Sequence, residues 1–164
     1  MSFIRLKKRD KNYYAYLVEN KWSRYAPKQK VKLYLGKYIK LNSEKVPENI
    51  AKIDLNKDKI FYSLLKNELL SYRFKQKNKD LFIHENGVTV NLKKHNVLKD
   101  NKEVCLGLNE GYLCSHTLKE LINFKSKSKN KKEEGTKLIK TLLNAGISLN
   151  KETFLEIFNK IIKT

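Results

Sequence analysis

The sequence predicts an α+β fold: an N-terminal three-stranded antiparallel sheet packed on a helix, a further β-hairpin region and a C-terminal helical pair. Apolar and polar residues alternate from Val31 to Leu41, which is the period of a strand. Apolar residues recur at helical spacing over 59–73 and again in two segments near the C-terminus. The 164 residues, 40% of them hydrophobic, suffice for one domain or two small ones.

The predicted sheet begins with a short strand over 3–8 and a polar turn over 9–12. A second strand over 13–19 is rich in the aromatic and β-branched residues that strands favour. A longer loop over 20–30 precedes the third strand, 31–41. Strict alternation on that strand directs Val31, Leu33, Leu35, Ile39 and Leu41 inward, and Lys32, Tyr34, Gly36, Tyr38 and Lys40 outward.

A helix is predicted over 59–73, with Asp58 as its N-cap. Its apolar residues recur at helical spacing, so we expect them to cover the inner face of the sheet. They are Ile60, Phe61, Leu64, Leu65 and Leu69.

The middle of the chain predicts further strands and a short helix. A hairpin over 81–92 turns at Asn86-Gly87, the strongest short-range turn signal in the sequence. Another strand is expected over 103–108. Ser115 is placed to cap a helix that ends near Phe124.

The C-terminal part predicts a linker and two helices. Lysine, serine and asparagine make up residues 125–132, which is typical of a basic linker. Helices over 133–144 and 151–162 would pair antiparallel, with Leu138, Ile139, Leu142 and Leu143 facing Phe154, Ile157, Phe158 and Ile161. The predicted division is therefore an α+β domain over 1–124, this linker, and a helical hairpin over 133–164.

The charge of the chain predicts a polyanionic partner. The formal net charge is +19, and residues 1–41 carry +10 of it. Such self-repulsion is tolerated mainly when a polyanion neutralises it. An acidic membrane surface is less favoured, because no basic amphipathic helix or lipidation motif is visible. No apolar run approaches the roughly 18 residues of a membrane span, so we expect a cytoplasmic protein with no membrane contact.

The strongest functional signal is a sheet face that carries both cations and aromatic rings. Lys and Arg give salt-dependent affinity by releasing counterions, and rings offer bases a stacking surface. The alternative is a solvated face whose tyrosines merely prefer strands. The assignment of Tyr14 and Tyr16 depends on a register that the sequence does not show. The expected members are Arg5, Lys7, Tyr14, Tyr16, Lys32, Tyr34, Tyr38 and Lys40.

Two further segments supply candidate contacts. The loop over 20–30 contains Trp22, Arg24, Lys28 and Lys30. Trp22 either stacks on a base or folds back as the loop's anchor on the core. The basic run over 125–132 either lies along phosphates or is a linker kept soluble by its lysines.

Metal and enzyme chemistry have weaker support. Cys105 and Cys114 are separated by eight residues, unlike the close pairs of zinc sites, so we expect free thiols in a reducing compartment. Only Cys114 and His116 lie close together in sequence. The chain has no phosphate-cradling glycine loop and no nucleophile elbow. We therefore expect no metal, no cofactor and no catalysis.

The N-terminal segment resembles the DNA-binding arm of some transposases and tyrosine recombinases, a small three-stranded sheet. The resemblance lies in Phe3-Ile-Arg-Leu-Lys, Tyr16-Leu-Val and Lys28-Gln-Lys-Val-Lys-Leu-Tyr-Leu-Gly36. With Asn109-Glu-Gly-Tyr-Leu-Cys114 and the helical C-terminus, the chain also looks like a group of small basic archaeal proteins without assigned function. The arm resemblance implies that Arg5, Lys7, Lys30, Lys32 and Lys40 match DNA-contacting positions. The catalytic arginines of a recombinase have no counterparts, since only Arg73 follows Arg24.

These patterns predict a non-catalytic nucleic-acid-binding protein, with DNA slightly favoured. One alternative is an RNA-binding ribosome- or tRNA-associated factor, because exposed tyrosines suit unstacked bases. Another is a metal-dependent nuclease with carboxylates in the neutral middle of the chain (Glu85, Asp100, Glu103 and Glu110). The C-terminal helical pair is also a possible contact surface for a protein partner.

Overall fold

Strands dominate the first two thirds of the chain and helices the last third, so the fold is α+β as predicted. The computed structural model describes residues 2–22, 27–43, 53–56, 59–127 and 130–162. The strands in these ranges are β1 (Ser2–Arg9), β2 (Asn12–Trp22), β3 (Pro27–Lys40), β4 (Lys75–Gln76), β5 (Leu81–Ile83), β6 (Val88–Asn91), β7 (Asn96–Lys99), β8 (Lys102–Leu108) and β9 (Gly111–Leu113). The helices are α1 (Ile60–Ser71), α2 (Ser115–Ile122), α3 (Lys131–Asn144) and α4 (Lys151–Ile161).

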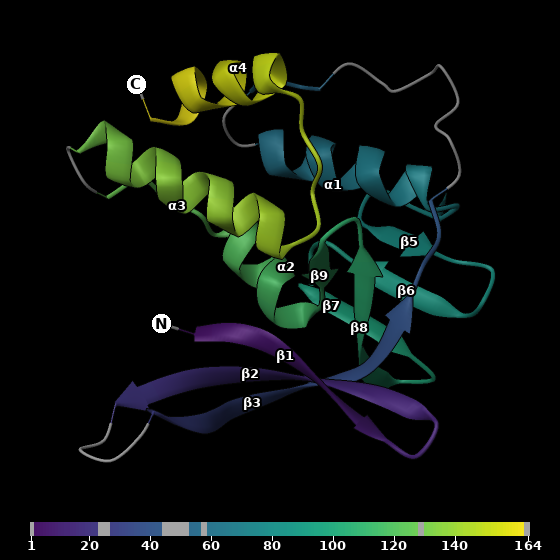
Figure 1. Cartoon of the computed structure of the whole chain (residues 1–164). Helices are drawn as coiled ribbons and strands as arrows, with labels where there is room; N and C mark the ends of the chain where they lie inside the picture. The colour runs from purple at the N-terminus through teal and green to yellow at the C-terminus, as the bar shows by residue number, and fades with distance from the viewer. Residues whose placement is uncertain (1, 23–26, 44–52, 57–58, 128–129, 163–164) are drawn as a thin grey trace.

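The strands join edge to edge in the order β1-β2-β3-β8-β7-β6-β5-β4, with β9 also paired to β8. Neighbouring strands are antiparallel except for β3 and β8, which run parallel from Lys37 opposite Val104 to Lys40 opposite Gly107. In Figure 1, β1, β2 and β3 form the lower edge of the molecule and the helices lie above them. Among the described strands, the β3–β8 pairing joins the N-terminal strands to the rest of the sheet.

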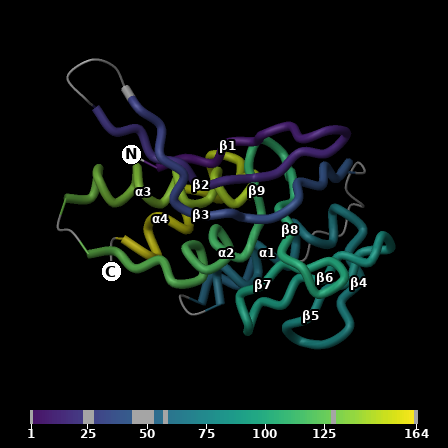
Figure 2. Tube along the Cα trace, turned by 90° about the horizontal axis from the view of Figure 1, so that it is seen from below, coloured from purple at the N-terminus to yellow at the C-terminus, as the bar shows by residue number. Residues whose placement is uncertain are grey.

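The β2–β3 ribbon is longer than the sequence predicts. The expected loop over 20–30 is wrong, because β2 continues to Trp22 and β3 starts at Pro27. Lys21 pairs with Lys28 in this extension. Figures 1 and 2 both show this end of the ribbon standing clear of the helices. Lys21 and Lys28, which were expected in a loop, therefore lie on β2 and β3.

Two hydrophobic clusters organise the packing. The larger combines side chains of all four helices with those of β5 to β9, among them Leu65, Phe82, Leu118 and Leu138. The smaller lies under the N-terminal sheet and consists of Ala15, Leu35, Cys105 and Cys114, with Ile4, Leu6, Leu17 and Tyr112 packed against it.

The helix predicted over 59–73 therefore has a different partner from the one expected. It is present as α1, and Ile60, Phe61, Leu64, Leu65 and Leu69 are buried as predicted. They belong to the larger cluster, however, and not to the inner face of β1–β3. The helix that follows Cys114, next to that inner face, is α2. Asp58 lies outside the described residues, and the cap position is Lys59.

The hairpin predicted over 81–92 is confirmed. The His84 N–H donates to the Val88 carbonyl at 2.8 Å, and Gly87 takes a positive φ of 84°. The strand expected over 103–108 is β8. The helix expected from Ser115 is α2, although its N-cap is Cys114. Three short strands were not predicted: β4, β7 and β9.

The two C-terminal helices are present, and their contact agrees with the predicted one only in part. α3 and α4 meet where Gly135 faces Phe158, since a Cβ on that glycine would lie 2.7 Å from the ring. Ile139 and Leu143, expected to face α4, are instead 41% and 55% exposed. None of the helices in the described ranges is long and apolar enough to cross a membrane.

The core continues across the predicted linker. Leu142 and Ile157 belong to the larger cluster together with α1 and α2. α3 begins at Lys131, inside the run expected to be a linker, and residues 128–129 of that run lie outside the described part. The division into 1–124, 125–132 and 133–164 stays a prediction.

Candidate nucleic-acid interface

The register of β1, β2 and β3 places cations and tyrosines in two rows. Arg5 lies opposite Tyr16, which lies opposite Tyr34. Lys7 lies opposite Tyr14, which lies opposite Lys37. Directly opposite residues of antiparallel strands point to the same side of the sheet. We call this side the basic tyrosine face; its members are Arg5, Lys7, Tyr14, Tyr16, Tyr34 and Lys37.

The Tyr34 ring of this face lies in contact range of the rings of Tyr14 and Tyr16. The ring centroids of Tyr16 and Tyr34 are 5.4 Å apart, and those of Tyr14 and Tyr34 are 6.4 Å apart. The Lys7 ammonium lies 5.3 Å from the centroid of the Tyr16 ring, a cation–π geometry. Tyr34 remains 47% exposed. The three tyrosines therefore form an aromatic surface, and the Lys7 ammonium lies over one of its rings.

The charge state of Tyr34 suits contact with a polyanion. Partial burial raises the pKa of this phenol, and the neighbouring Tyr16 and Tyr14 raise it further. The positive charge of Arg9 partly opposes this rise in the pKa. A phenol with a raised pKa stays neutral at physiological pH, where it repels no phosphate and can donate a hydrogen bond.

Polar side chains extend the face towards the ribbon end. The Arg5 guanidinium donates to Gln29 Oε1, and Gln29 Nε2 donates to Asn20 Oδ1 at 3.3 Å. Val18 lies on β2 between Tyr16, which is opposite Arg5, and Asn20, which is opposite Gln29. The Val18 side chain is fully buried. The hydrogen bond to Gln29 uses one of the five N–H donors of Arg5, which leaves donors for a phosphate.

Two irregularities in β3 make the predicted face partly wrong. Lys32 and Leu35 have no residue opposite them on β2, so the strand shifts register at both positions. Each β-bulge reverses the alternation of side chains beyond it. Lys32 consequently lies on the inner side, where its ammonium is 3.2 Å from Glu19 Oε2 and it lines a cleft with Ile4.

Tyr38 also leaves the predicted face. It lies against Gly107, where a Cβ would come within 2.2 Å of the Tyr38 hydroxyl, and its ring meets Tyr112 edge-on at 6.0 Å. Lys40 is exposed and lines a cavity of about 450 Å³ together with Tyr38. These two residues therefore form a separate polar surface at the end of β3.

The remaining predicted contacts have separate positions. Trp22 is 88% exposed, so it does not act as an anchor on the core. Lys28 is exposed opposite Lys21, and Lys30 is exposed opposite Glu19, on the Glu19 side of the ribbon. Arg24 lies outside the described residues.

Lys37 is the member of the basic tyrosine face that sequence reasoning missed. Strict alternation from Lys32 assigns it to the inner side, but the bulge at Leu35 returns it to the side of Tyr14. Gly36 is the one local signal, because a glycine inside a strand often marks a bulge. Its φ is 111°, and a Cβ there would lie 2.2 Å from the Glu103 carbonyl oxygen.

The two cysteines are free and buried, as expected from their spacing. A hydrogen bond to Cys114, together with burial, raises the pKa of the Cys105 thiol. Within the described ranges, no three side chains of His, Cys, Asp or Glu gather as a metal site would require. In the basic run, the Lys127 N–H donates to Glu134 Oε2 at 3.1 Å, and Glu134 is buried beside Lys137.

Comparison of the chain with protein-family models, with curated proteins and with solved structures finds no significant match.

Proposed function

We propose that this protein binds nucleic acid through the basic tyrosine face without catalysing a reaction, and that DNA is slightly favoured over RNA. The observation that carries the proposal is the coincidence of Arg5, Lys7 and Lys37 with three clustered tyrosines on one side of β1–β3. Cations alone occur on many solvated surfaces. Cations interleaved with clustered aromatic rings match both the phosphates and the bases of a nucleic acid.

The shape of the sheet favours DNA. The backbones of two paired strands such as β2 and β3 lie about 4.8 Å apart. The major groove of B-DNA is about 12 Å wide and admits a β-ribbon. The end of the β2–β3 ribbon stands clear of the helices, so a groove can receive this end without meeting them (Figures 1 and 2). Lys21 and Lys28 at the projecting end would then reach the phosphates beside the groove.

RNA is the second candidate, in a ribosome- or tRNA-associated role. The observation that favours it is the exposure of aromatic side chains, above all Trp22, which stands at the end of β2. Unstacked bases in RNA loops stack on such rings. The metal-dependent nuclease has no supporting ligand cluster among the described residues, and we do not propose it.

Two further parts of the proposal concern location and partners. Two free, buried cysteines fit a reducing compartment, which favours the cytoplasm. A protein partner on the C-terminal helices is favoured by the exposed Ile139 and Leu143 of α3.

Fluorescence anisotropy with labelled duplex DNA, single-stranded DNA and structured RNA tests this function. The proposal expects binding whose affinity falls steeply with salt, and somewhat tighter binding to duplex DNA than to the other two. Tighter binding to structured RNA would favour the second candidate. Absence of binding to all three probes at low salt would contradict the proposal.

A further inference from the structure

A second basic feature lies away from the basic tyrosine face. A cavity of about 680 Å³ opens between the first turns of α1 and the segment that joins β4 to β5. This is within the range of small-ligand sites. Figures 1 and 2 both separate α1 and β5 from the β1–β3 sheet. The cavity is therefore a distinct candidate site.

Four lysines line this cavity: Lys59 and Lys66 from α1 and its N-cap, Lys79 from the segment between β4 and β5, and Lys93 after β6. The Lys59 ammonium lies 3.8 Å from Asp54 Oδ2. In the part of the chain that the structure describes, the other three take part in no ion pair. Asp54 and Asp80 are the carboxylates of the lining, so cations exceed anions. The rim therefore attracts an anion.

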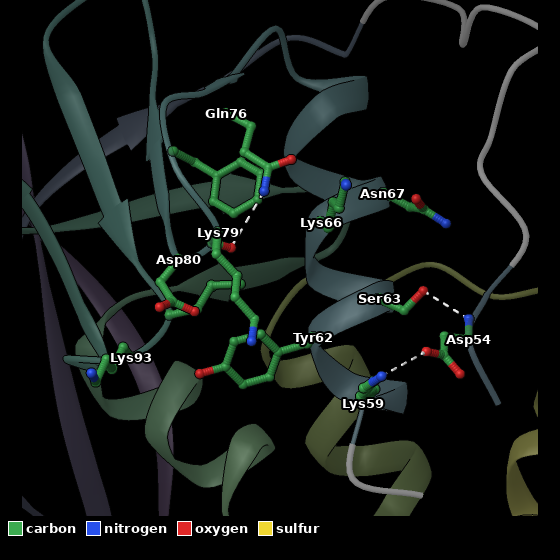
Figure 3. Close-up of a pocket in the computed structure, with 12 residues that line it drawn as sticks. Asp54, Lys59, Tyr62, Ser63, Lys66, Asn67, Gln76, Lys79, Asp80 and Lys93 are labelled. Carbon is green, nitrogen blue, oxygen red and sulfur yellow. Dashed lines mark hydrogen bonds and ion pairs between the residues drawn. The ribbon is translucent and has the colours of Figure 1, made fainter. Parts of the chain in front are cut away.

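The floor of the cavity is apolar and partly aromatic. Phe82 and Leu92 are buried, and Tyr62 is half-buried beside them. Burial raises the pKa of Tyr62 and Asp80 raises it further, so its ring stays neutral. In Figure 3 the Lys79 side chain extends towards the Tyr62 ring. A ligand that covers this floor would have an ammonium group beside it.

Amide side chains complete the lining. Gln76 and Asn67 both line the cavity, and Gln76 Nε2 donates to the Lys79 carbonyl at 3.3 Å. The Gln76 carbonyl oxygen and the Asp80 carboxylate are acceptors for the edge of a planar polar ring. An inorganic anion would use the lysines but leave the aromatic floor uncovered.

We propose that this cavity binds a nucleotide, with the base on the Tyr62 side of the floor and the phosphate among Lys66, Lys79 and Lys93. The same chemistry is offered by a free mononucleotide and by the 5′-phosphorylated end of a strand. The site does not depend on the basic tyrosine face, so the two proposals can fail separately.

Isothermal titration calorimetry with adenosine 5′-monophosphate, adenosine and inorganic phosphate tests the site. The monophosphate should bind at least about 10-fold more tightly than either fragment, since only it uses both floor and rim. The Lys79→Gln/Lys93→Gln variant should lose about 10-fold in this affinity. The Lys7→Gln/Lys37→Gln variant removes the same charge from the other face and should change it less than about 2-fold.

Competition with short oligonucleotides then distinguishes the two sources. Displacement of the monophosphate by a 5′-phosphorylated tetranucleotide, but not by its 5′-hydroxyl form, supports a strand end. Displacement by neither form supports a free mononucleotide. No binding of the monophosphate to the unmodified protein, or equal losses in the two double variants, would overturn the proposal. If the Lys7→Gln/Lys37→Gln variant loses its binding to duplex DNA but keeps its affinity for the monophosphate, that result concerns the basic tyrosine face and not the cavity.

Discussion

Tyr16 and Tyr34 lie directly opposite each other on β2 and β3, with ring centroids 5.4 Å apart and ring planes inclined at 53°. This pairing places the two rings at the centre of the basic tyrosine face, between Arg5 on β1 and the Lys7 ammonium above Tyr16. Tyr34 is half exposed, so it is the ring that a base can reach. The functional proposal depends on this geometry.

Replacing Tyr34 tests the role of the rings. Tyr34→Leu should weaken binding to single-stranded nucleic acid roughly 10-fold, because stacking contributes about 1–3 kcal/mol per base. Tyr13→Leu is the matched control: Tyr13 is equally exposed but lies on β2 next to Tyr14, pointing to the other side of the sheet. Fluorescence anisotropy at constant salt measures both. Equal losses in the two variants would show that the face is not specifically involved.

Gly36 should be required for the attachment of β3 to β8. It combines a φ of 111° with a site where a Cβ would lie 2.2 Å from the Glu103 carbonyl oxygen. Gly36→Ala should therefore lower the free energy of unfolding by about 2–4 kcal/mol. Gly87→Ala shares a positive φ of 84° but has open space around its Cβ, and it should cost only about 1–2 kcal/mol. Urea unfolding gives both values, and similar losses would contradict the close approach.

Glu68 should make stability depend on pH. Burial raises the pKa of this carboxyl, while hydrogen bonds from Asn109 Nδ2 at 2.6 Å and the Ser148 N–H partly oppose the shift. The folded state then holds the proton more tightly than the unfolded state. The stability that protonation of Glu68 contributes is full below the ordinary carboxyl pKa and is lost as pH rises through the raised value.

Glu68→Gln should remove the loss of stability that the ionisation of Glu68 causes as the pH rises. The amide oxygen can still accept from Asn109, and no buried charge forms at neutral pH. Urea unfolding at pH 4 and pH 7 should therefore show a smaller fall in stability for the variant than for the unmodified protein. The exposed Glu156→Gln variant controls for the change in net charge. An unchanged fall in Glu68→Gln would contradict the assignment.

Local patterns in the sequence predict most elements of this fold. Alternation identifies β1, β2 and β3, Asn86-Gly87 identifies the hairpin, and helical spacing identifies α1. They do not show which elements meet. The parallel pairing of Lys37 with Val104 joins segments far apart in the chain, and no local pattern encodes it. The inner face of the first three strands therefore packs on Cys105 and Cys114 and not on α1.

The candidate site is predictable only in part for the same reason. Arg5, Lys7, Tyr14, Tyr16 and Tyr34 share one face as expected. Lys32 and Tyr38 do not, because bulges at positions 32 and 35 change the alternation of β3. A bulge depends on how a strand meets its neighbours, here β2 on one edge and β8 on the other. The composition of residues 1–41 shows that this segment is basic. The register between β2 and β3 determines which of its cations lie on the same face.

Lys37 and Lys32 provide the most direct test of the central claim, because they lie on one strand and on opposite sides of it. Lys37→Gln and Lys32→Gln remove the same charge. Salt titration of binding to the best nucleic-acid probe should give a slope of log affinity against log salt that is about 0.9 shallower for Lys37→Gln. The slope of Lys32→Gln should match that of the unmodified protein. Equal changes in the two variants, or no salt dependence at all, would contradict binding through the basic tyrosine face.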